Sequence, residues 1–253
     1  MALPRGYISH SQIRAYKECP RKYRLAYVEN IQPPGNDKVF LGEIFHYAIE
    51  HYFLQRIGGV LPTDEELEDY FRSRFDTDAS NRDISWRSPR DETRQRGLAF
   101  LRHFLRSVAP YTRPLMVEKE LGAELPGSGV LLKGVIDLVE EDFSITDFKT
   151  TTGRWSESRA RNSPQMIIYK YLFDRSFGPL PANLKYEVFY GRNAGNVRHQ
   201  TLRVIPDAGA TEALLVMIED VVQRIGAGVF PASETSLCRH CEFRAACRDM
   251  GPA

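Results

Sequence analysis

The sequence lacks several features that would set its class at once. None of its 253 residues falls in an apolar run long enough to cross a membrane, and residues 1–6 have no apolar core of the kind found in secretory signal peptides. There is no internal repeat and no low-complexity tract. The phosphate-binding pattern G-x4-G-K-[S/T] is also missing, so we expect no ATPase motor in this chain. These absences favour a protein without a membrane segment, working in the cytoplasm.

A strong excess of charge is also missing. The chain has 34 Lys and Arg against 33 Asp and Glu, a formal net charge of +1. A protein that binds the phosphate backbone of nucleic acid over a large surface is usually more basic, so the total charge alone does not indicate nucleic-acid binding.

The first 28 residues are different, because their basic side chains are interleaved with tyrosines. Basic groups for phosphates and rings for bases suit a surface that binds a single strand. An amphipathic helix with its tyrosines in the core remains the alternative. The candidate nucleic-acid contacts in this segment are Arg14, Tyr16, Arg21 and Lys22.

Cysteine is scarce but unevenly placed. Cys19 is near the N-terminus, whereas Cys238, Cys241 and Cys247 form a C-x2-C-x5-C cluster. A reducing compartment argues against two structural disulfides, and the C-x2-C spacing suits two ligands of one metal centre. Four thiolates fit either a [4Fe-4S] cluster or a structural zinc ion, for which His240 is a possible competing ligand. The alternative to a shared metal centre is that the four cysteines are unrelated buried thiols. One shared centre would clamp the two chain ends together.

The composition is that of a protein with a real core, with 42% hydrophobic and 11% aromatic residues. We expect one domain over residues 1–253: a mostly helical part at 1–110, a sheet core at 111–206, and a C-terminal helix with the cysteine cluster at 207–253, closing onto Cys19. Hydrophobic periodicity predicts the main elements. The expected helices are 39–57, 64–75, 94–108 and 208–225, with a further helix beginning at Pro164, and the expected strands are 115–121, 134–139, 145–150, 184–190 and 198–205. Residues 76–90 are polar and predict a loop.

Strands 134–139 and 145–150 form the most informative segment, a predicted hairpin. Side chains alternate along a strand, so Asp147 and Lys149 share one face while Phe148 points into a core. Asp137 can lie across the pair from Asp147. Two carboxylates beside an apolar interior are costly unless they hold a cation. A solvated strand face is the alternative.

The possible roles of several other polar residues depend on whether they lie near this hairpin. His46 lies in the apolar helix 39–57, where a satisfied core histidine is the common case, yet a helix packed on the sheet could aim it at the aspartates as a metal ligand. Gln165 and Tyr169 have i, i+4 spacing and share a helix face. Arg159 and Arg161 belong to a basic, hydroxyl-rich connection that could meet phosphates or be only solvated.

Together these motifs resemble the PD-(D/E)xK nucleases, specifically the RecB-like branch that carries an iron-sulfur cluster. That branch includes the AddB nuclease domain, the CRISPR-associated RecB-like exonucleases and related phage exonucleases. The resemblance covers nearly the whole chain and implies an α/β (α+β) fold with a restriction-endonuclease-like core, a mixed central sheet flanked by helices. The matching motifs are Gly42-x3-His46, Gly134-x2-Asp137, Asp147-Phe148-Lys149, Gln165-x3-Tyr169 and the one-plus-three cysteines. An additional acid on the preceding strand is either Glu118 or Glu120.

The resemblance implies a metal-dependent DNA exonuclease. His46, Asp137, Asp147 and the main-chain carbonyl of Phe148 would hold Mg²⁺ or Mn²⁺, and Lys149 would help activate water. Gln165 and Tyr169 would position the strand. The four cysteines would bind a [4Fe-4S] cluster.

The resemblance also implies a substrate and a setting. Single-stranded DNA cut with 5′-to-3′ polarity is expected, in a bacterial, archaeal or phage-infected cell. Recombination, repair, phage DNA metabolism and CRISPR adaptation all stay open, each with a possible protein partner. A non-catalytic iron-sulfur module that binds DNA or supports assembly, with the same fold, is the alternative.

Overall fold

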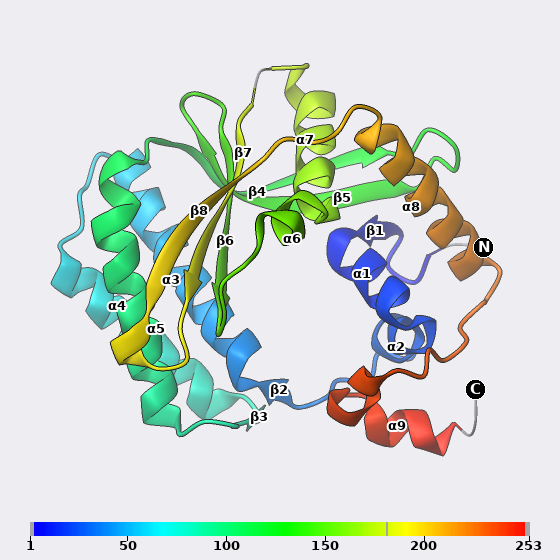
Figure 1. Ribbon diagram of the computed structural model, residues 1–253, viewed down its shortest axis with the longest axis horizontal. Helices are drawn as coiled ribbons and strands as arrows, with labels where there is room; N and C mark the ends of the chain where they lie inside the picture. The colour runs from blue at the N-terminus through cyan, green and yellow to red at the C-terminus, as the bar shows by residue number, and fades with distance from the viewer. Residues whose placement is uncertain (1–2, 181, 251–253) are drawn as a thin grey trace.

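The computed structural model describes residues 3–180 and 182–250, apart from the side chain of Leu237. Helices precede and follow most of the main strands along the chain, and two further helices lie between the strands Ile145–Thr151 and Leu184–Tyr190 (Figure 1). The helices are α1 (His10–Glu18), α2 (Pro20–Tyr23), α3 (Asp37–Ile57), α4 (Asp64–Asn81), α5 (Arg90–Ser107), α6 (Glu157–Arg161), α7 (Pro164–Phe177), α8 (Ala210–Gly226) and α9 (Arg244–Asp249). The strands are β1 (Tyr7–Ser9), β2 (Gly35–Asn36), β3 (Ile84–Ser85), β4 (Pro114–Glu124), β5 (Leu131–Glu140), β6 (Ile145–Thr151), β7 (Leu184–Tyr190) and β8 (Arg198–Val204).

The main sheet is mixed, which confirms the predicted fold class. β4 pairs antiparallel along one edge of β5, and β6 and β7 run parallel to each other before β8 returns antiparallel. The other edge of β5 is shared. β1 pairs with Leu131–Lys133, and β6 pairs only with Leu138 and Val139. Residues 134–137 of the long strand β5, which end in Asp137, therefore lie between the parts that pair with these two neighbours.

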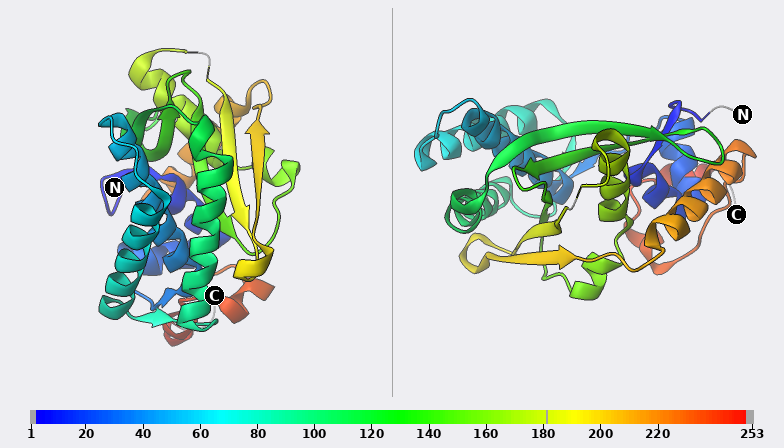
Figure 2. Two further views of the ribbon diagram at one scale, coloured as in Figure 1. Left: turned by 90° about the vertical axis from the view of Figure 1, so that its left-hand side faces the viewer. Right: turned by 90° about the horizontal axis from the view of Figure 1, so that it is seen from above.

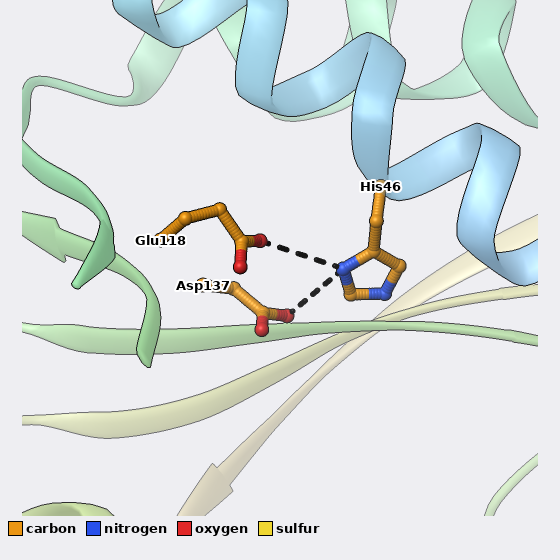
Figure 3. A group of neighbouring side chains, drawn as sticks. All are labelled: His46, Glu118 and Asp137. Atoms are coloured by element: carbon orange, nitrogen blue, oxygen red, sulfur yellow. Dashed lines mark ion pairs between the residues drawn. The ribbon is translucent and has the colours of Figure 1, made fainter. Parts of the chain in front are cut away.

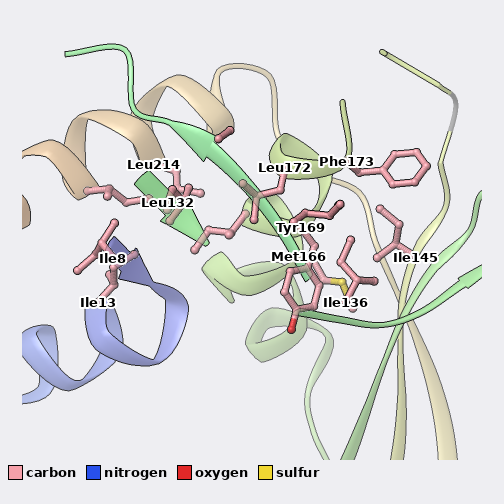
Figure 4. Packing of buried hydrophobic residues seen from close by; sticks show 14 of the residues in the cluster. Ile8, Ile13, Leu132, Ile136, Ile145, Met166, Tyr169, Leu172, Phe173 and Leu214 are labelled. Atoms are coloured by element: carbon pink, nitrogen blue, oxygen red, sulfur yellow. The ribbon is translucent and has the colours of Figure 1, made fainter. Parts of the chain in front are cut away.

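Helices cover both faces of this sheet. α3, α4 and α5 lie on one side, and α7, α8 and the N-terminal α1 lie on the other (Figures 1 and 2). Each side has its own apolar core. The α3 side is rich in buried phenylalanine, including Phe53, Phe104 and Phe148. On the α7 side Ile136, Tyr169 and Leu172 pack together, and Ile8 and Ile13 extend this core to the N-terminus (Figure 4).

Two glycines of the sequence motifs allow close approach between these layers. A Cβ on Gly134 would lie 2.9 Å from Cδ1 of Leu172, so a side chain here would push against the α7 residues that pack on β5. A Cβ on Gly42 would lie 3.3 Å from Oγ1 of Thr150. The motif glycines therefore set how near α7 and α3 come to the strands that carry Asp137 and Lys149.

Local signals explain several element boundaries. The Asn36 side chain accepts from the N–H groups of Lys38 and Val39, so α3 begins at Asp37, two residues before the predicted start. A capping box of Thr63 and Glu66 begins α4, where the Thr63 side chain and the Glu66 side chain each accept a backbone N–H of the other residue.

The prediction of a loop over residues 76–90 is wrong in part. α4 continues past Phe75 to Asn81, and α5 begins at Arg90. This extra helix is polar because it faces solvent, and ion pairs support it, including Arg74 with Asp78 at 3.2 Å. Composition alone does not separate an exposed helical turn from a loop.

The first strand was also missed. Residues 7–9, which are absent from the predicted strands, form β1, a parallel partner of β5, with Ile8 fully buried. Ser9 is the N-cap of α1, but its side chain makes no capping hydrogen bond. Three residues are too few for a periodic signal, and the pairing depends on a strand more than 120 positions away.

Candidate functional site

A group of three ligand-type side chains lies between α3 and the β4–β5 pair. Atoms of His46, Glu118 and Asp137 lie within 4.8 Å of one another (Figure 3). His46 comes from the middle of α3, Asp137 from β5, and Glu118 from β4. Val117 and Lys119 pair with Leu138 and Ile136, so Glu118 stands opposite Asp137 across the ladder.

The orientation of the His46 ring follows from its hydrogen bond. Nε2 lies 2.9 Å from the carbonyl oxygen of Phe148, and a carbonyl can only accept, so Nε2 donates. In the neutral ring Nδ1 then carries the lone pair, and it lies 3.5 Å from Asp137 Oδ2 and 3.9 Å from Glu118 Oε1. A lone pair facing two carboxylates is repulsive unless a proton or a cation lies between them.

The pKa values of His46 and Asp137 reflect the same electrostatic interaction in the absence of a cation. Burial alone would lower the pKa of His46, but Asp137, followed by Glu118, raises it to about 9. Burial raises the pKa of Asp137, against the attraction of His46 and Lys149. A divalent cation at this place would favour the ionised carboxylates and the neutral ring.

Asp147 lies beside this group without belonging to it. It is fully buried, and Lys149 Nζ lies 2.6 Å from its Oδ2. Burial, followed by the charge of Asp137, raises the pKa of Asp147 to about 7. Oδ2 has the ion pair with Lys149, whereas Oδ1 has no hydrogen-bond partner in the described part of the chain. A buried carboxylate with one unpaired oxygen next to three assembled ligand atoms fits a divalent cation.

The structure adds one acid to the expected ligand set. Glu118 lies in the assembled group with His46 and Asp137. The Phe148 carbonyl accepts a hydrogen bond from His46, and its role and that of Asp147 as metal ligands stay predictions. Sequence reasoning could not choose between Glu118 and Glu120, and the structure separates them, because Glu120 pairs with Lys133 at 2.8 Å.

Glu118 carries a further signal that sequence patterns do not show. Its φ is 45°, in the left-handed region that is uncommon for a residue with a Cβ. Such a conformation costs about 1–3 kcal/mol and persists only where the surroundings impose it. The strained backbone therefore marks the acid that completes the group.

The residues of the Gln-x3-Tyr motif are buried near the same strands. Gln165 Nε2 donates to Tyr169 Oη at 2.8 Å, so the i, i+4 pair makes its own hydrogen bond. Gln165 also lines a cavity of about 680 Å³ that reaches Lys149. Burial raises the pKa of the Tyr169 hydroxyl well above its ordinary value, so this group stays protonated.

The predicted nucleic-acid contacts fall into separate places. Arg14 and Arg159 line the cavity beside Lys149, whereas Arg21 and Lys22 line a second cavity near the chain ends. Arg161 is exposed in α6 and lines neither.

The prediction that Tyr16 presents its ring to a base is wrong. Only 5% of it is exposed, and its hydroxyl donates to the Val229 carbonyl at 2.6 Å. The ring packs edge-on against Tyr23 and Phe230, because this face of α1 contacts the C-terminal segment.

All four cysteines line the second cavity, which has a volume of about 950 Å³. Cys19 lies between α1 and α2, and the other three come from the segment that ends in α9. Backbone N–H groups point at two of the sulfurs: Ser233 N lies 3.3 Å from Cys19 Sγ and Thr235 N lies 3.5 Å from Cys238 Sγ. N–H groups of this kind stabilise thiolates that hold a metal centre. His240, the possible zinc ligand, is exposed at the rim.

Further contacts fasten the chain ends around this cavity. Arg21 N donates to the Pro231 carbonyl at 3.1 Å, and Lys22 forms ion pairs of 3.0 Å with both Glu18 and Glu242. Lys22 is thus occupied in joining α2 to the C-terminal segment.

Within residues 3–180 and 182–250 no helix combines the length and hydropathy that a membrane span needs.

Comparison with known proteins gives two kinds of likeness. The crystal structure of a proposed exonuclease from Eubacterium rectale superposes with a TM-score of 0.62 at 12% identity, covering 92% of this chain and 87% of that one. At this identity the likeness supports the fold alone. A second solved structure, SSO0001, covers 93% of this chain and 95% of its own at 13% identity, but its TM-score of 0.37 is too low to argue from.

No curated protein matches the chain. A sequence model of the PD-(D/E)XK nuclease superfamily matches residues 7–248, nearly the full length. The match spans the α3 histidine, the strands with Asp137 and Asp147, and the cysteines at both ends. The chain therefore belongs to the PD-(D/E)XK nuclease superfamily.

Proposed function

We propose that the protein is a Mg²⁺- or Mn²⁺-dependent DNA exonuclease that shortens single strands, with 5′-to-3′ polarity. The observation that carries this proposal is the lone pair of His46 Nδ1 facing the carboxylates of Glu118 and Asp137, beside the Asp147–Lys149 ion pair. Membership of a nuclease superfamily supplies the reaction class, hydrolysis of phosphodiester bonds in DNA.

In this proposal His46, Glu118 and Asp137 hold the cation, with Asp147 as a further carboxylate within the same pocket. The bound cation would polarise the scissile phosphate and lower the pKa of an attacking water. Oxygen donors suit Mg²⁺, and the imidazole shifts the preference somewhat toward Mn²⁺. The hydrogen bond from His46 Nε2 to Phe148 fixes the ring so that Nδ1 faces the carboxylates.

Lys149 is the residue that we propose to act on the reacting groups. It is 27% exposed and fixed by Asp147, so its ammonium reaches the cavity while it stays next to the carboxylates. A fixed positive charge there orients the attacking water and stabilises the charge that develops on the phosphate. Gln165 and Tyr169 lie close enough to position the strand.

The cysteine cavity has a separate role in this proposal. Cys19, Cys238, Cys241 and Cys247 would hold a [4Fe-4S] cluster that fastens α1 and α2 to the C-terminal segment, as in the RecB-like iron-sulfur branch. The whole chain would then act as one nuclease domain. Arg14 and Arg159 would contact the DNA backbone between the clamped ends and the catalytic pocket.

The proposed setting is the cytoplasm, in recombination, repair, phage DNA metabolism or CRISPR adaptation, with a protein partner from that pathway. A strand end that enters between the clamped chain ends and the sheet favours an exonuclease over an endonuclease. A strand without an end would not enter in this way.

Digestion of end-labelled DNA tests the proposal. Linear single strands, duplexes and circular single strands are incubated with anaerobically purified protein and Mn²⁺, Mg²⁺ or EDTA. Stepwise shortening of linear strands, survival of circles and loss of activity in EDTA and in Lys149→Ala are expected. Lys133→Ala, on the neighbouring strand and paired with Glu120, is the matched control and stays active.

Two further outcomes decide between readings. Protein that binds strands but cuts none under any metal is a non-catalytic DNA-binding or assembly module. Visible absorption with iron and sulfide by chemical analysis supports the [4Fe-4S] cluster, whereas colourless protein with one zinc per chain contradicts it.

A further inference from the structure

The strand β8 forms an outer edge of the main sheet, on the side away from β4 (Figures 1 and 2). Register brings this edge close to the proposed catalytic residue, because Lys149 pairs with Val188 and Val188 pairs with Gln200. Residues in register share a sheet face, so Gln200 lies on the face of Lys149. Neighbouring strands are about 4.8 Å apart, which places the β8 backbone roughly 10 Å from that of Lys149.

The surface around β8 carries many basic groups and few acids. Residues 190–205 contain three arginines and no aspartate or glutamate. The connection between β6 and α7 lies against β8, where Arg154 Nε donates to Gln200 Oε1 at 2.8 Å. We call this surface the β8 edge, and its exposed arginines are Arg106, Arg154, Arg161, Arg192, Arg198 and Arg203.

Arginines on the adjoining helical surface are neutralised by acids. Six arginines on or next to α4 and α5 form ion pairs with carboxylates: Arg72, Arg74, Arg82, Arg90, Arg94 and Arg102. In contrast, no arginine of the β8 edge pairs with a carboxylate of residues 3–180 or 182–250. Positive charge that the protein itself does not neutralise is available to an anionic partner.

A histidine of α5 responds to this charge. Burial, followed by the charge of Arg106, lowers the pKa of His103, and the charges of His199 and Arg198 act in the same direction. His103 therefore lies within reach of arginines from both α5 and β8. The β8 edge is thus one continuous basic surface across these two elements.

The β8 edge has no exposed ring on which a base could stack. Residues 191–205 contain no phenylalanine, tyrosine or tryptophan. Trp155, in the connection beside β8, is 9% exposed, and the Arg159 guanidinium lies 4.1 Å from the centre of its ring. Surfaces that bind single strands combine basic groups with aromatic rings, whereas a duplex keeps its bases stacked and presents its phosphates. This edge therefore suits a duplex.

We propose that the β8 edge binds the phosphate backbone of a duplex from which the strand to be degraded extends as a single-stranded overhang. The overhang crosses the sheet face from β8 to Lys149. Arg192, Arg198 and Arg203 contact the duplex phosphates. This inference rests on the proposed nuclease function, because it names the form of DNA that the same site receives.

The test measures binding separately from cleavage. Fluorescence anisotropy of the full-length protein in EDTA is recorded with a single strand, and with the same strand as an overhang on a duplex, over a range of KCl concentrations. We expect the overhang DNA to bind about tenfold more tightly than the single strand.

A triple variant assigns this advantage to the β8 edge. Each lost phosphate contact lowers the slope of log Kd against log salt by about 0.9, so Arg192→Gln, Arg198→Gln and Arg203→Gln together should lower it by about 2.7. The affinity for the single strand should change by less than about twofold, because these arginines contact the duplex. Arg248→Gln, exposed in α9 on the opposite side of the molecule, is the matched control and keeps the advantage (Figure 1).

Other results overturn the inference. Equal affinity for the overhang DNA and the single strand does so, and so does an advantage that the triple variant retains. Equal weakening of both DNAs in the triple variant also overturns it, because the edge then contacts the single strand. Addition of Mn²⁺ tests the proposed function separately: protein that prefers the overhang DNA through these arginines but cuts neither DNA keeps the duplex site and loses the nuclease.

Discussion

The two clusters of chemistry-bearing residues are held in different ways. His46, Glu118 and Asp137 come from a long helix and two long strands, and the phenylalanine core lies directly behind them. The four cysteines come from short helices and irregular segments around an open cavity, with Cys238 exposed. Packing therefore assembles the first cluster before any cation binds, whereas the second has few contacts of its own. We expect the catalytic group to be independent of its metal for structure, and the cysteine end to depend on its centre.

The largest effect is expected from Asp137→Asn. The amide oxygen can still accept the hydrogen bond that Phe148 N–H now donates to Asp137 at 2.8 Å, but a carboxylate of the metal group is lost. Cleavage should fall by at least about a hundredfold while the melting temperature stays the same or rises, because a buried charge is removed. Digestion assays and thermal melts check this, with Asp142→Asn in the β5–β6 turn as control. A large drop in melting temperature would show that the group is not pre-assembled.

The contribution of the core behind the group is tested by Phe53→Ala. Phe53 is fully buried in α3, and its ring packs against Phe104 and Phe148. Truncation should lower the free energy of unfolding by about 3–5 kcal/mol. Phe243→Ala, at the edge of the cysteine cavity, should cost clearly less. Denaturant titration of both variants measures the difference, and equal costs would remove the contrast between the two regions.

Loss of the cysteine centre should release one end of the molecule and spare the other. In Cys247→Ser we expect rapid proteolysis within residues 232–250, because contacts such as Lys22 with Glu242 lose their support. The melting transition of the remaining core should move by less than about 3 °C. Mn²⁺ affinity of the His46 group, measured by calorimetry, should change less than about twofold. Loss of Mn²⁺ binding would show that the two regions are coupled.

The smallest expected effect is a pH dependence of stability without metal. The pKa of His46 is about 9 in the folded protein against 6.5 for a free histidine, so between these values the folded state binds more protons. Stability that is complete below pH 6.5 is therefore lost as the pH rises toward 9. Asp147, with a pKa of about 7, acts in the same direction up to that pH.

We expect the melting temperature in EDTA to fall by at least about 2 °C between pH 6.5 and 9. Saturating Mn²⁺ should flatten or reverse this slope, because the cation replaces the proton at His46 Nδ1. His46→Gln should lose the slope, and His240→Gln, an exposed histidine, should keep it. A slope that is the same with and without Mn²⁺ would contradict a cation at this group.

Much of the fold could be predicted because its signals are local. Alternation of side chains along the chain predicted the strands around Asp137 and Asp147. The observed β7 has the same range as predicted, 184–190. Apolar periodicity gave α3, α5 and α8, with ends within a few residues. The errors fell where local sequence is ambiguous, in the polar end of α4 and in the three-residue strand β1.

The sequence by itself determined which side chains are available for chemistry. The order of the histidine, aspartate, lysine and cysteine motifs along the chain carried the resemblance to the nuclease family. Their spacing also placed Asp147 and Lys149 on the same strand face, with Phe148 in the core behind it.

Only the tertiary structure decided how these residues meet. Glu118 lies near His46, whereas Glu120 forms an ion pair with Lys133. Tyr16 is buried against the C-terminal segment, and the Phe148 carbonyl accepts a hydrogen bond from His46. Each of these outcomes depends on the register and close packing of segments far apart in the chain. Local propensity cannot encode such contacts, because their energy exists only when the layers of the fold have come together.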